Sequence, residues 1–291
     1  MILYYLIIPV LYFFAYLPSS ILYVLADGVA FVLYHIVGYR KKVVFDNLRK
    51  SFPDKSSEEI LSIAKLSYKH LAYRVVENIK CMTISAQEID ERMAAKNIEA
   101  INKYYEEGRH VVLLVGHIAA WEYGGYKMSI ACKHKLYGIV SLVTNPHFNK
   151  MVQRTRGKMG MQLIPMRDAK DFFAQQLPQP SLTVFIGDQS PSNPKNAYWT
   201  KLFNRDTGFF TGGERYARQH NCVVFYPKIV QKGRGYYTAE MIEITNAPNT
   251  LPENEITERY VRILEQQLTE YPADWLWSHK RWKHSILKID N

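Results

Sequence analysis

The sequence has few cysteines, and none of them fits a metal site or a disulfide framework. Cys81, Cys132 and Cys222 are far apart and match no metal-ligand spacing. The chain also has no Gly-x-x-x-x-Gly-Lys loop for nucleotide phosphates and no His-Glu-x-x-His helix for zinc. These absences argue against a disulfide-stabilised secreted protein, a zinc hydrolase and an enzyme that consumes ATP. We expect neither a metal nor a cofactor.

Charged residues are absent from the first 26 positions, and before Arg40 the only one is Asp27. Pro9 and Pro18 interrupt this apolar run, and Pro18-Ser19-Ser20 is typical of a turn between two segments. Each segment is a little shorter than the roughly 20 residues of a full membrane span. The pattern therefore predicts one inserted helix and a second helix that lies against membrane or protein.

The basic run Arg40-Lys41-Lys42 closes the apolar segment, and the positive-inside rule then leaves the rest of the chain in the cytoplasm. No basic residue precedes the apolar run and no clear cleavage site follows it, so a cleavable signal peptide is not expected. The mean hydropathy of −0.22 argues against further spans. We expect a membrane anchor over residues 1–39 and a cytosolic body over residues 40–291.

The net charge of +10 indicates an acidic partner, such as nucleic acid, anionic lipid or an acidic carrier protein. The basic residues are scattered and no recognised nucleic-acid-binding module is present, so we expect no nucleic acid partner. With 47% hydrophobic residues, the chain can bury a substantial core.

Strand-like and helix-like runs alternate along most of the chain, which predicts an α/β fold with a mixed central sheet flanked by helices, largely parallel in its first part. A capping box at Ser56–Glu59 opens a helix within Val43–Lys80. Further helices are expected at Ile98–Tyr105, Phe148–Met159, Asp168–Leu177, Gly212–His220 and Glu255–Tyr271. Strands are expected at Val111–Val115, Leu136–Val143, Gln162–Ile164, Leu182–Ile186, Val223–Val230 and Tyr236–Ile244.

His117 and Glu122 lie where the apolar run Val111–Val115 ends at Gly116 and a helix-like segment begins near Ala119. On a continuous helix, five steps would place the pair about 140° apart, so they can meet only at a strand-to-helix corner. A carboxylate beside an imidazole fixes its tautomer and raises its basicity. We therefore expect Glu122 to hold His117 as a general base. By spacing alone, a buried histidine with an unrelated surface glutamate is the simpler interpretation.

Three further stretches follow predicted strands, where open α/β sheets place their sites. They are Ile164-Pro165-Met166-Arg167, the polar run from Gly187-Asp188-Gln189 to Asn193, and Phe225-Tyr226-Pro227-Lys228, in which we expect Pro227 to break the strand. Each is ordinary when taken alone.

In this order and spacing the blocks resemble the glycerolipid and lysophospholipid acyltransferase superfamily, and most closely its late lipid A (lipopolysaccharide) acyltransferase branch. The resemblance rests on the apolar N-terminus, the His-x4-Glu corner and three other blocks: Asn47–Pro53, Asp188-Gln189 with Lys195-Asn196-Ala197 downstream, and Trp275–Lys283. One departure is visible, because Ala119-Ala120 stand where the family has Gly-Asn before Trp-Glu.

The resemblance implies transfer of a fatty acyl group from acyl carrier protein or coenzyme A to a hydroxyl of a membrane lipid, most directly a lipid A precursor. It places the protein at the cytoplasmic face of a bacterial inner membrane. His117 would be the base, with Glu122 holding it. No Gly-x-Ser-x-Gly elbow is present, which favours direct transfer over an acyl-enzyme.

Four other residues are candidates for substrate binding. Arg167 matches the superfamily's second-block arginine and would bind acceptor phosphate or the developing oxyanion. Arg154 and Arg156 point apart on one helix, and we favour Arg156 as the one that enters the site. Asp188 and Gln189 correspond to the third block, with acceptor binding and loop bracing as competing roles.

Two clusters, Arg40-Lys41-Lys42 and Lys280, Arg281 and Lys283, are candidates for docking an acidic carrier protein or anionic lipid headgroups. Trp275 and Trp277 are expected mainly to pack. Two alternatives stay open: the same chemistry on an aminolipid or a secondary-metabolite lipid, and a non-catalytic basic protein that binds membrane surfaces.

Overall fold

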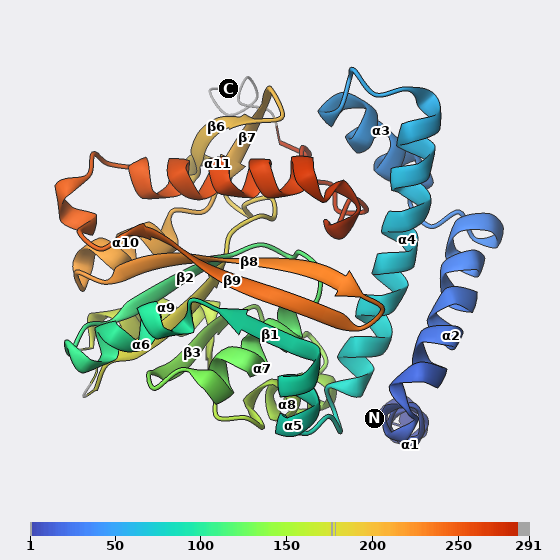
Figure 1. The fold of residues 1–291 in the computed structure, drawn as a ribbon, viewed down its shortest axis with the longest axis horizontal. Helices are drawn as coiled ribbons and strands as arrows, with labels where there is room; N and C mark the ends of the chain where they lie inside the picture. The colour runs from blue at the N-terminus through green and yellow to red at the C-terminus, as the bar shows by residue number, and fades with distance from the viewer. Residues whose placement is uncertain (1, 176, 178, 285–291) are drawn as a thin grey trace.

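The computed structural model describes residues 2–175, 177 and 179–284. In this part of the chain, seven strands form one sheet in the order β1-β9-β8-β2-β5-β3-β4, with helices on both faces (Figure 1). Strands β8, β2, β5, β3 and β4 run parallel to one another, β9 is antiparallel to β8, and β1 is parallel to β9. The predicted mixed α/β fold is confirmed. The strands are β1 (Met93–Lys96), β2 (Val111–Val115), β3 (Lys135–Val140), β4 (Gln162–Pro165), β5 (Ser181–Ile186), β8 (Val223–Gly233) and β9 (Tyr236–Thr245).

Strand β2 lies between β8 and β5, and all five of its residues are buried. Its unbroken Val/Leu composition is what a parallel strand covered on both faces requires. Its carboxyl end is next to that of β5, since Val115 pairs with Ile186. These neighbouring strand ends carry the candidate site.

The expected helices are present with small shifts of their ends. The capping box is confirmed: the Ser56 hydroxyl accepts from the Glu59 backbone N–H, and the Glu59 carboxylate accepts from that of Ser56. The expected helix Asp168–Leu177 ends earlier than predicted, since α9 stops at Ala174. Residue 176 of the expected helix lies outside the described residues. The helices of the body are α3 (Lys41–Ser51), α4 (Ser57–Lys80), α5 (Ala86–Arg92), α6 (Ile98–Glu106), α7 (Trp121–Ala131), α8 (Pro146–Gly157), α9 (Ala169–Ala174), α10 (Gly212–Gln219) and α11 (Glu255–Glu270).

Several features differ from expectation, and strand β1 and helix α5 were not predicted. An antiparallel hairpin of β6 (Tyr198–Leu202) and β7 (Arg205–Phe209) forms a separate two-stranded sheet that was not predicted. The prediction that Pro227 breaks a strand is wrong, because β8 continues to Gly233. Beyond Phe225 this strand pairs only with β9 and no longer with β2, which leaves one side free for a residue without an N–H.

The apolar N-terminus forms α1 (Ile2–Tyr16), α2 (Ser19–Phe31) and a π-helical turn, η1 (Val32–Ile36). The helix over Ser19–Ile36 is long and apolar enough to cross a membrane by length and composition. The predicted break at Pro18 is confirmed, whereas Pro9 lies within α1. Helix α2 runs beside α4 and packs against it (Figure 1).

The C-terminal segment after α11 folds back against α3 and α4. The Asn47 amide donates to the carbonyls of Trp277 (2.9 Å) and His279 (3.1 Å), and the Arg74 guanidinium donates to the Asp274 carbonyl (2.9 Å). The Trp275 and Trp277 side chains are buried, as predicted. This packing places the tryptophans behind the carboxyl ends of β2 and β5.

Candidate active site

His117 and Asp188 each follow their strand by the same two-residue step. The paired residues Val115 and Ile186 end β2 and β5, a glycine follows each, and then come the two side chains. The Gly187 N–H donates to the Val115 carbonyl (3.1 Å), which extends the strand pairing to the corner. The register of two parallel strands therefore sets the imidazole beside the carboxylate.

Asp188 is 1% exposed and accepts three hydrogen bonds. Its Oδ1 lies 2.6 Å from His117 Nδ1, and its Oδ2 accepts from the His117 backbone N–H (2.8 Å) and from the Trp275 indole N–H (2.7 Å). Burial raises the pKa of Asp188, but His117 and these donors outweigh it and hold the pKa below its ordinary value. Asp188 is therefore a buried, ionised partner of the histidine.

Burial alone lowers the pKa of His117, while the charge of Asp188 and its hydrogen bond raise it, and the net pKa lies above the ordinary value. With Nδ1 directed at a carboxylate, Nε2 is the nitrogen left to face the site. The Gln189 amide nitrogen lies 3.4 Å from Nε2, and the Trp121 ring packs edge-on against the imidazole at 5.2 Å. The histidine is thus held on three sides.

Glu122 forms no hydrogen bond with His117 in the structure, which differs from the expected geometry, although its charge contributes to raising the pKa of the histidine. Its carboxylate instead receives the Arg156 guanidinium, with Arg156 Nε 3.1 Å from both oxygens and Nη2 also bonded to Oε1. The physical reason is competition: Asp188 already occupies Nδ1, and a bidentate guanidinium is a strong partner for a carboxylate. Glu122 is in the first turn of α7 as expected, but its partner comes from α8.

The corner between β2 and α7 contains a strained residue. Ala119 has φ +47°, in the left-handed region that favours glycine, and its N–H donates to the Asp274 carbonyl (3.1 Å). Helix α7 begins two residues later than expected, at Trp121. The alanine thus occupies a backbone position where a glycine would be relaxed.

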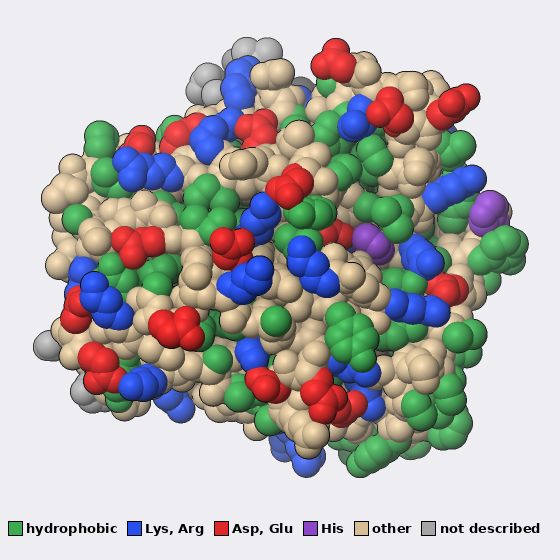
Figure 2. Space-filling model, viewed as in Figure 1, with side chains coloured by type: hydrophobic (Ala, Val, Ile, Leu, Met, Phe, Trp, Pro, Cys, Tyr) green, Lys and Arg blue, Asp and Glu red, His purple; other side chains and the backbone are tan. Residues whose placement is uncertain are grey.

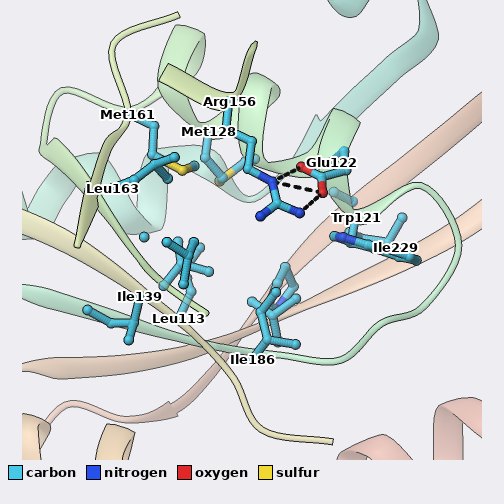
Figure 3. A pocket seen from close by; sticks show the side chains of 18 of the residues that line it. Leu113, Trp121, Glu122, Met128, Ile139, Arg156, Met161, Leu163, Ile186 and Ile229 are labelled. Carbon is cyan, nitrogen blue, oxygen red and sulfur yellow. Dashed lines mark hydrogen bonds and ion pairs between the residues drawn. The ribbon is translucent and has the colours of Figure 1, made fainter. Parts of the chain in front are cut away.

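An apolar pocket is lined by residues of α7 and by Val115 and Ile186, which end β2 and β5 (Figure 3). Including its open mouth, the pocket has about 690 Å³ of empty space. Among the described residues, Glu122 and Arg156 are its only charged lining residues, and Trp121 joins the pocket to the imidazole. The apolar side chains labelled in Figure 3 are Leu113, Met128, Ile139, Met161, Leu163, Ile186 and Ile229.

Glycines allow the pocket walls to approach closely. A Cβ added to Gly124 would meet Ile229 Cδ1 at 2.8 Å, and one added to Gly138 would meet Met161 Sδ at 3.0 Å. Larger residues at these positions would push side chains into the pocket. An apolar slot beside an activated histidine is suited to an alkyl chain whose end is the site of reaction.

The family model for bacterial lipid A biosynthesis acyltransferases matches residues 1–284. The chain belongs to this family. It is 21% identical over 280 residues to the lipid A biosynthesis lauroyltransferase of Escherichia coli K12, covering 95% of this chain and 90% of that protein. It is 20% identical to the palmitoleoyltransferase of the same organism and to the lipid A biosynthesis acyltransferase of Shigella flexneri, covering 94% of this chain and 89% of each relative.

Membership of the lipid A acyltransferase family makes the protein an acyltransferase and confirms the resemblance drawn from the sequence blocks. The alternative of a non-catalytic binding protein is therefore wrong. Identity near 20% leaves the roles of single residues to be argued from their geometry.

Of the other arginines considered as candidates in this acyltransferase, one lines the pocket, two are exposed and one is buried. Arg156 enters the site, whereas Arg154 is exposed on the same helix. The Arg167 side chain is 76% exposed at the end of β4, where it pairs with Asp168 (3.4 Å). Arg281 cannot be a docking charge: it is 3% exposed, donates to the Gly208 carbonyl (2.6 Å) and covers the Phe209 ring.

Two functional contacts were missed by sequence reasoning. The matching steps Val115-Gly116-His117 and Ile186-Gly187-Asp188 signalled that the two polar side chains would be neighbours if β2 and β5 were adjacent. The Trp275 indole, which fixes Asp188 from behind, had no such signal, because its place depends on how the C-terminal segment folds back.

Proposed function

We propose that this enzyme transfers a fatty acyl group from a thioester donor, acyl carrier protein or acyl-coenzyme A, to a hydroxyl of a membrane lipid, most directly a lipid A precursor. The observation that carries the proposal is the place of His117, which is held by a buried carboxylate and packs against Trp121, a lining residue of the apolar pocket. The relatives in Escherichia coli are named for lipid A biosynthesis, which supports this choice of acceptor.

His117 is the general base of the proposed reaction. The hydrogen bond to Asp188 assigns the imidazole proton to Nδ1 and leaves the lone pair on Nε2. Nε2 takes the proton of the acceptor hydroxyl as that oxygen attacks the thioester carbonyl. The carbon–sulfur bond then breaks, and the proton passes from Nε2 to the leaving thiolate.

Glu122 and Arg156 act as one unit in this proposal. Arg156 Nη1 has no hydrogen-bond partner among the described residues, so it can donate to the oxyanion that forms on the thioester carbonyl. Glu122 fixes the guanidinium and keeps its charge at the pocket. The alkyl chain of the donor occupies the apolar space beyond the pair. Arg167 and Gln189 are proposed to contact the acceptor.

The proposed location is the inner membrane of a bacterium, with the catalytic body on its cytoplasmic side. Residues 1–39 supply the apolar surface, and residues 40–291 form the body. The apolar helix over Ser19–Ile36 and the basic run at Arg40–Lys42 support this arrangement.

The test of the chemistry is the full-length protein in detergent with acyl carrier protein thioesters, acyl-coenzyme A and a lipid A precursor. His117→Ala should lower the rate about 10²–10⁴-fold, the usual contribution of a general base, and circular dichroism should show that the variant is still folded. His110→Gln is the control, because His110 precedes the same strand at its opposite end and contacts Ser181 (2.9 Å). A wild-type rate for His117→Ala would show that the base is another residue.

Mass spectrometry of membrane lipids from cells with and without the gene tests the acceptor. We expect a lipid A species that lacks one acyl chain when the gene is absent. A change confined to an aminolipid or a secondary-metabolite lipid would replace the acceptor and keep the chemistry.

A further inference from the structure

The apolar N-terminal helices each have two different faces. On α2, the residues Leu22, Tyr23, Ala26 and Ala30 are buried against Ala72, Tyr73 and Val76 of α4. The opposite face is apolar as well but uncovered, with Val24 62% and Phe31 57% exposed. On α1, Leu6, Val10 and Phe13 are exposed in the same way. Figure 2 shows hydrophobic side chains gathered at the lower right, over the place where Figure 1 draws α1 and α2.

The helix over Ser19–Ile36 carries a charge at its midpoint, at the border of the face that covers α4. Asp27 is the ninth of the eighteen residues from Ser19 to Ile36. It lies 3.7 Å from Lys69 Nζ, forms an ion pair with Arg234 and accepts from the Tyr73 hydroxyl (3.1 Å). Lys69 is on α4 and Arg234 is at the turn between β8 and β9. The middle of the apolar helix is therefore tied to charged groups of the catalytic body.

Further hydrogen bonds join the helices to the body along their length. The Tyr23 hydroxyl donates to the buried carboxylate of Glu77 (2.6 Å), and Arg234 donates to the Tyr23 carbonyl (2.5 Å). Lys80 Nζ donates to the carbonyls of Ala15 and Leu17, both at 3.3 Å. These contacts fix α2 to the body along its length and fix the C-terminal end of α1 to α4.

A spanning arrangement conflicts with these contacts. If α2 crossed the bilayer, Asp27 would lie at its centre and would carry Lys69 and Arg234 with it, or would lose both. Helix α4 would have to enter the hydrocarbon too, although the part of it that packs against α2 carries Lys69, Arg74 and Glu77. An arrangement parallel to the membrane plane meets neither difficulty, because the polar face stays with the protein and the apolar face meets lipid.

We propose that α1 and α2 lie in the plane of one membrane leaflet and do not span the bilayer. Their uncovered apolar faces enter the acyl-chain region, and Asp27, Lys69 and Arg234 lie at the level of the headgroups. The occupant of this surface is an anionic phospholipid leaflet, since Arg40 and Lys42 follow the apolar face directly and the chain carries a net charge of +10.

The arrangement also brings the leaflet to the catalytic pocket. Tyr4 of α1 packs edge-on against Phe148 of α8 at 5.3 Å, and α8 supplies Arg156 at the pocket. A lipid acceptor would thus reach the site from the leaflet in which the enzyme rests. The inference deepens the proposed function, on whose membrane location it rests.

The test places single cysteines in the full-length protein in cells. Ser20→Cys lies at an exposed position in the first turn of α2, next to the break between the helices, and Lys42→Cys lies beyond them. A membrane-impermeant maleimide added to intact spheroplasts should label neither, and both should be labelled after permeabilisation. If α2 spans the bilayer with the body in the cytoplasm, Ser20→Cys is exposed to the outside, so its labelling in intact spheroplasts would overturn the proposal.

A second measurement covers the case in which lipid shields the cysteine. The variants Val24→Trp and Phe31→Trp are purified and bound to vesicles of anionic and brominated phospholipids. After the fluorescence of the parent protein is subtracted, bromines near the headgroup should quench the new tryptophan more than bromines at the chain ends do, in both variants. Stronger quenching of Val24→Trp by bromines at the chain ends would place it at the bilayer centre and overturn the proposal. Recovery of the protein in the soluble fraction would overturn the proposed membrane location as well, whereas a membrane-bound protein with a labelled Ser20→Cys would leave that location intact.

Discussion

Asp188 contacts His117 with both carboxylate oxygens, one on the ring nitrogen Nδ1 (2.6 Å) and one on the backbone N–H (2.8 Å). The same carboxylate therefore fixes the ring and the peptide that carries it. Because the two residues follow adjacent parallel strands, the orientation of the base is set by the sheet and does not depend on the first turn of α7.

We expect Asp188→Asn to slow the enzyme and to shift its pH profile. Asp188 raises the pKa of His117, so removing the charge should lower that pKa. A base must be unprotonated to act, and the acid limb of the kcat profile should therefore move to lower pH. Asp206→Asn, at an exposed ion pair with Lys201, is the control and should move nothing. An unmoved acid limb in Asp188→Asn would contradict the assignment.

Glu122 and Arg156 should behave as one unit in a double-mutant cycle. If Glu122 acts by holding the guanidinium, then Glu122→Gln and Arg156→Gln each break the same pair. The double variant should lose little more than the worse single variant in kcat/KM, because coupled residues are not additive. Losses that multiply would instead favour separate roles, including a direct action of Glu122 on the histidine.

The sequence was sufficient for six strands of the large sheet, for most of the helices and for the position of His117 after β2, because these depend on local periodicity and on where apolar runs end. Strand β1, helix α5 and the β6–β7 hairpin were missed, since their segments are short or lack a clear period. It pointed to Glu122 as the partner of His117 because the two are close in the chain. The partner in the structure, Asp188, is 71 residues away and is brought there by strand order, which no local pattern records. The Trp275 indole on Asp188 comes from 87 residues further along the chain and depends on how the C-terminal segment folds back.

Ala119→Gly should stabilise the protein. A non-glycine residue in the left-handed region costs about 1–2 kcal/mol, and a glycine regains part of this while adding freedom to the unfolded chain. We expect a net gain of about 1 kcal/mol in the free energy of unfolding by urea denaturation. Ala169→Gly, at the start of α9 in a helical conformation, should have the opposite sign. Destabilisation by Ala119→Gly would mean that the corner is not strained.

Gly138→Ala should shift donor preference toward shorter acyl chains. The added Cβ would lie 3.0 Å from Met161 Sδ and 3.3 Å from Leu163 Cδ2, and both are flexible side chains that line the pocket. Displacing them removes space of about one methylene, which is worth roughly 0.8 kcal/mol of binding or about a fourfold change in kcat/KM. Competition between thioesters of two chain lengths measures the shift. Gly212→Ala, with no atom within 4 Å of the new Cβ, is the control.

The two basic clusters suggested for docking lie side by side. Arg40 Nη1 donates to the Ser278 carbonyl (3.1 Å), which brings the start of α3 next to the C-terminal segment. Arg281 is buried, so the exposed charges of the combined patch are Arg40, Lys42, Lys280 and Lys283. The sequence has no nucleotide-phosphate loop for activating a free fatty acid, so the enzyme must receive an acyl thioester. We expect this basic patch to bind an acidic acyl carrier protein that delivers it.

Reversal of Lys280 and Lys283 to glutamate should raise KM for the acyl carrier protein donor and leave KM for acyl-coenzyme A little changed. Complementary charge acts mainly on the rate of association, and exposed charges are screened over about 8 Å at physiological ionic strength. The wild-type KM for the carrier protein should therefore rise steeply with salt, and the charge-reversed variant should lose that dependence. Assays in neutral detergent remove the competing role of these lysines at lipid headgroups. Lys103→Glu on α6, at an exposed ion pair with Glu107, is the control. Equal effects on both donors would show that the patch serves the fold or the membrane and does not dock the carrier.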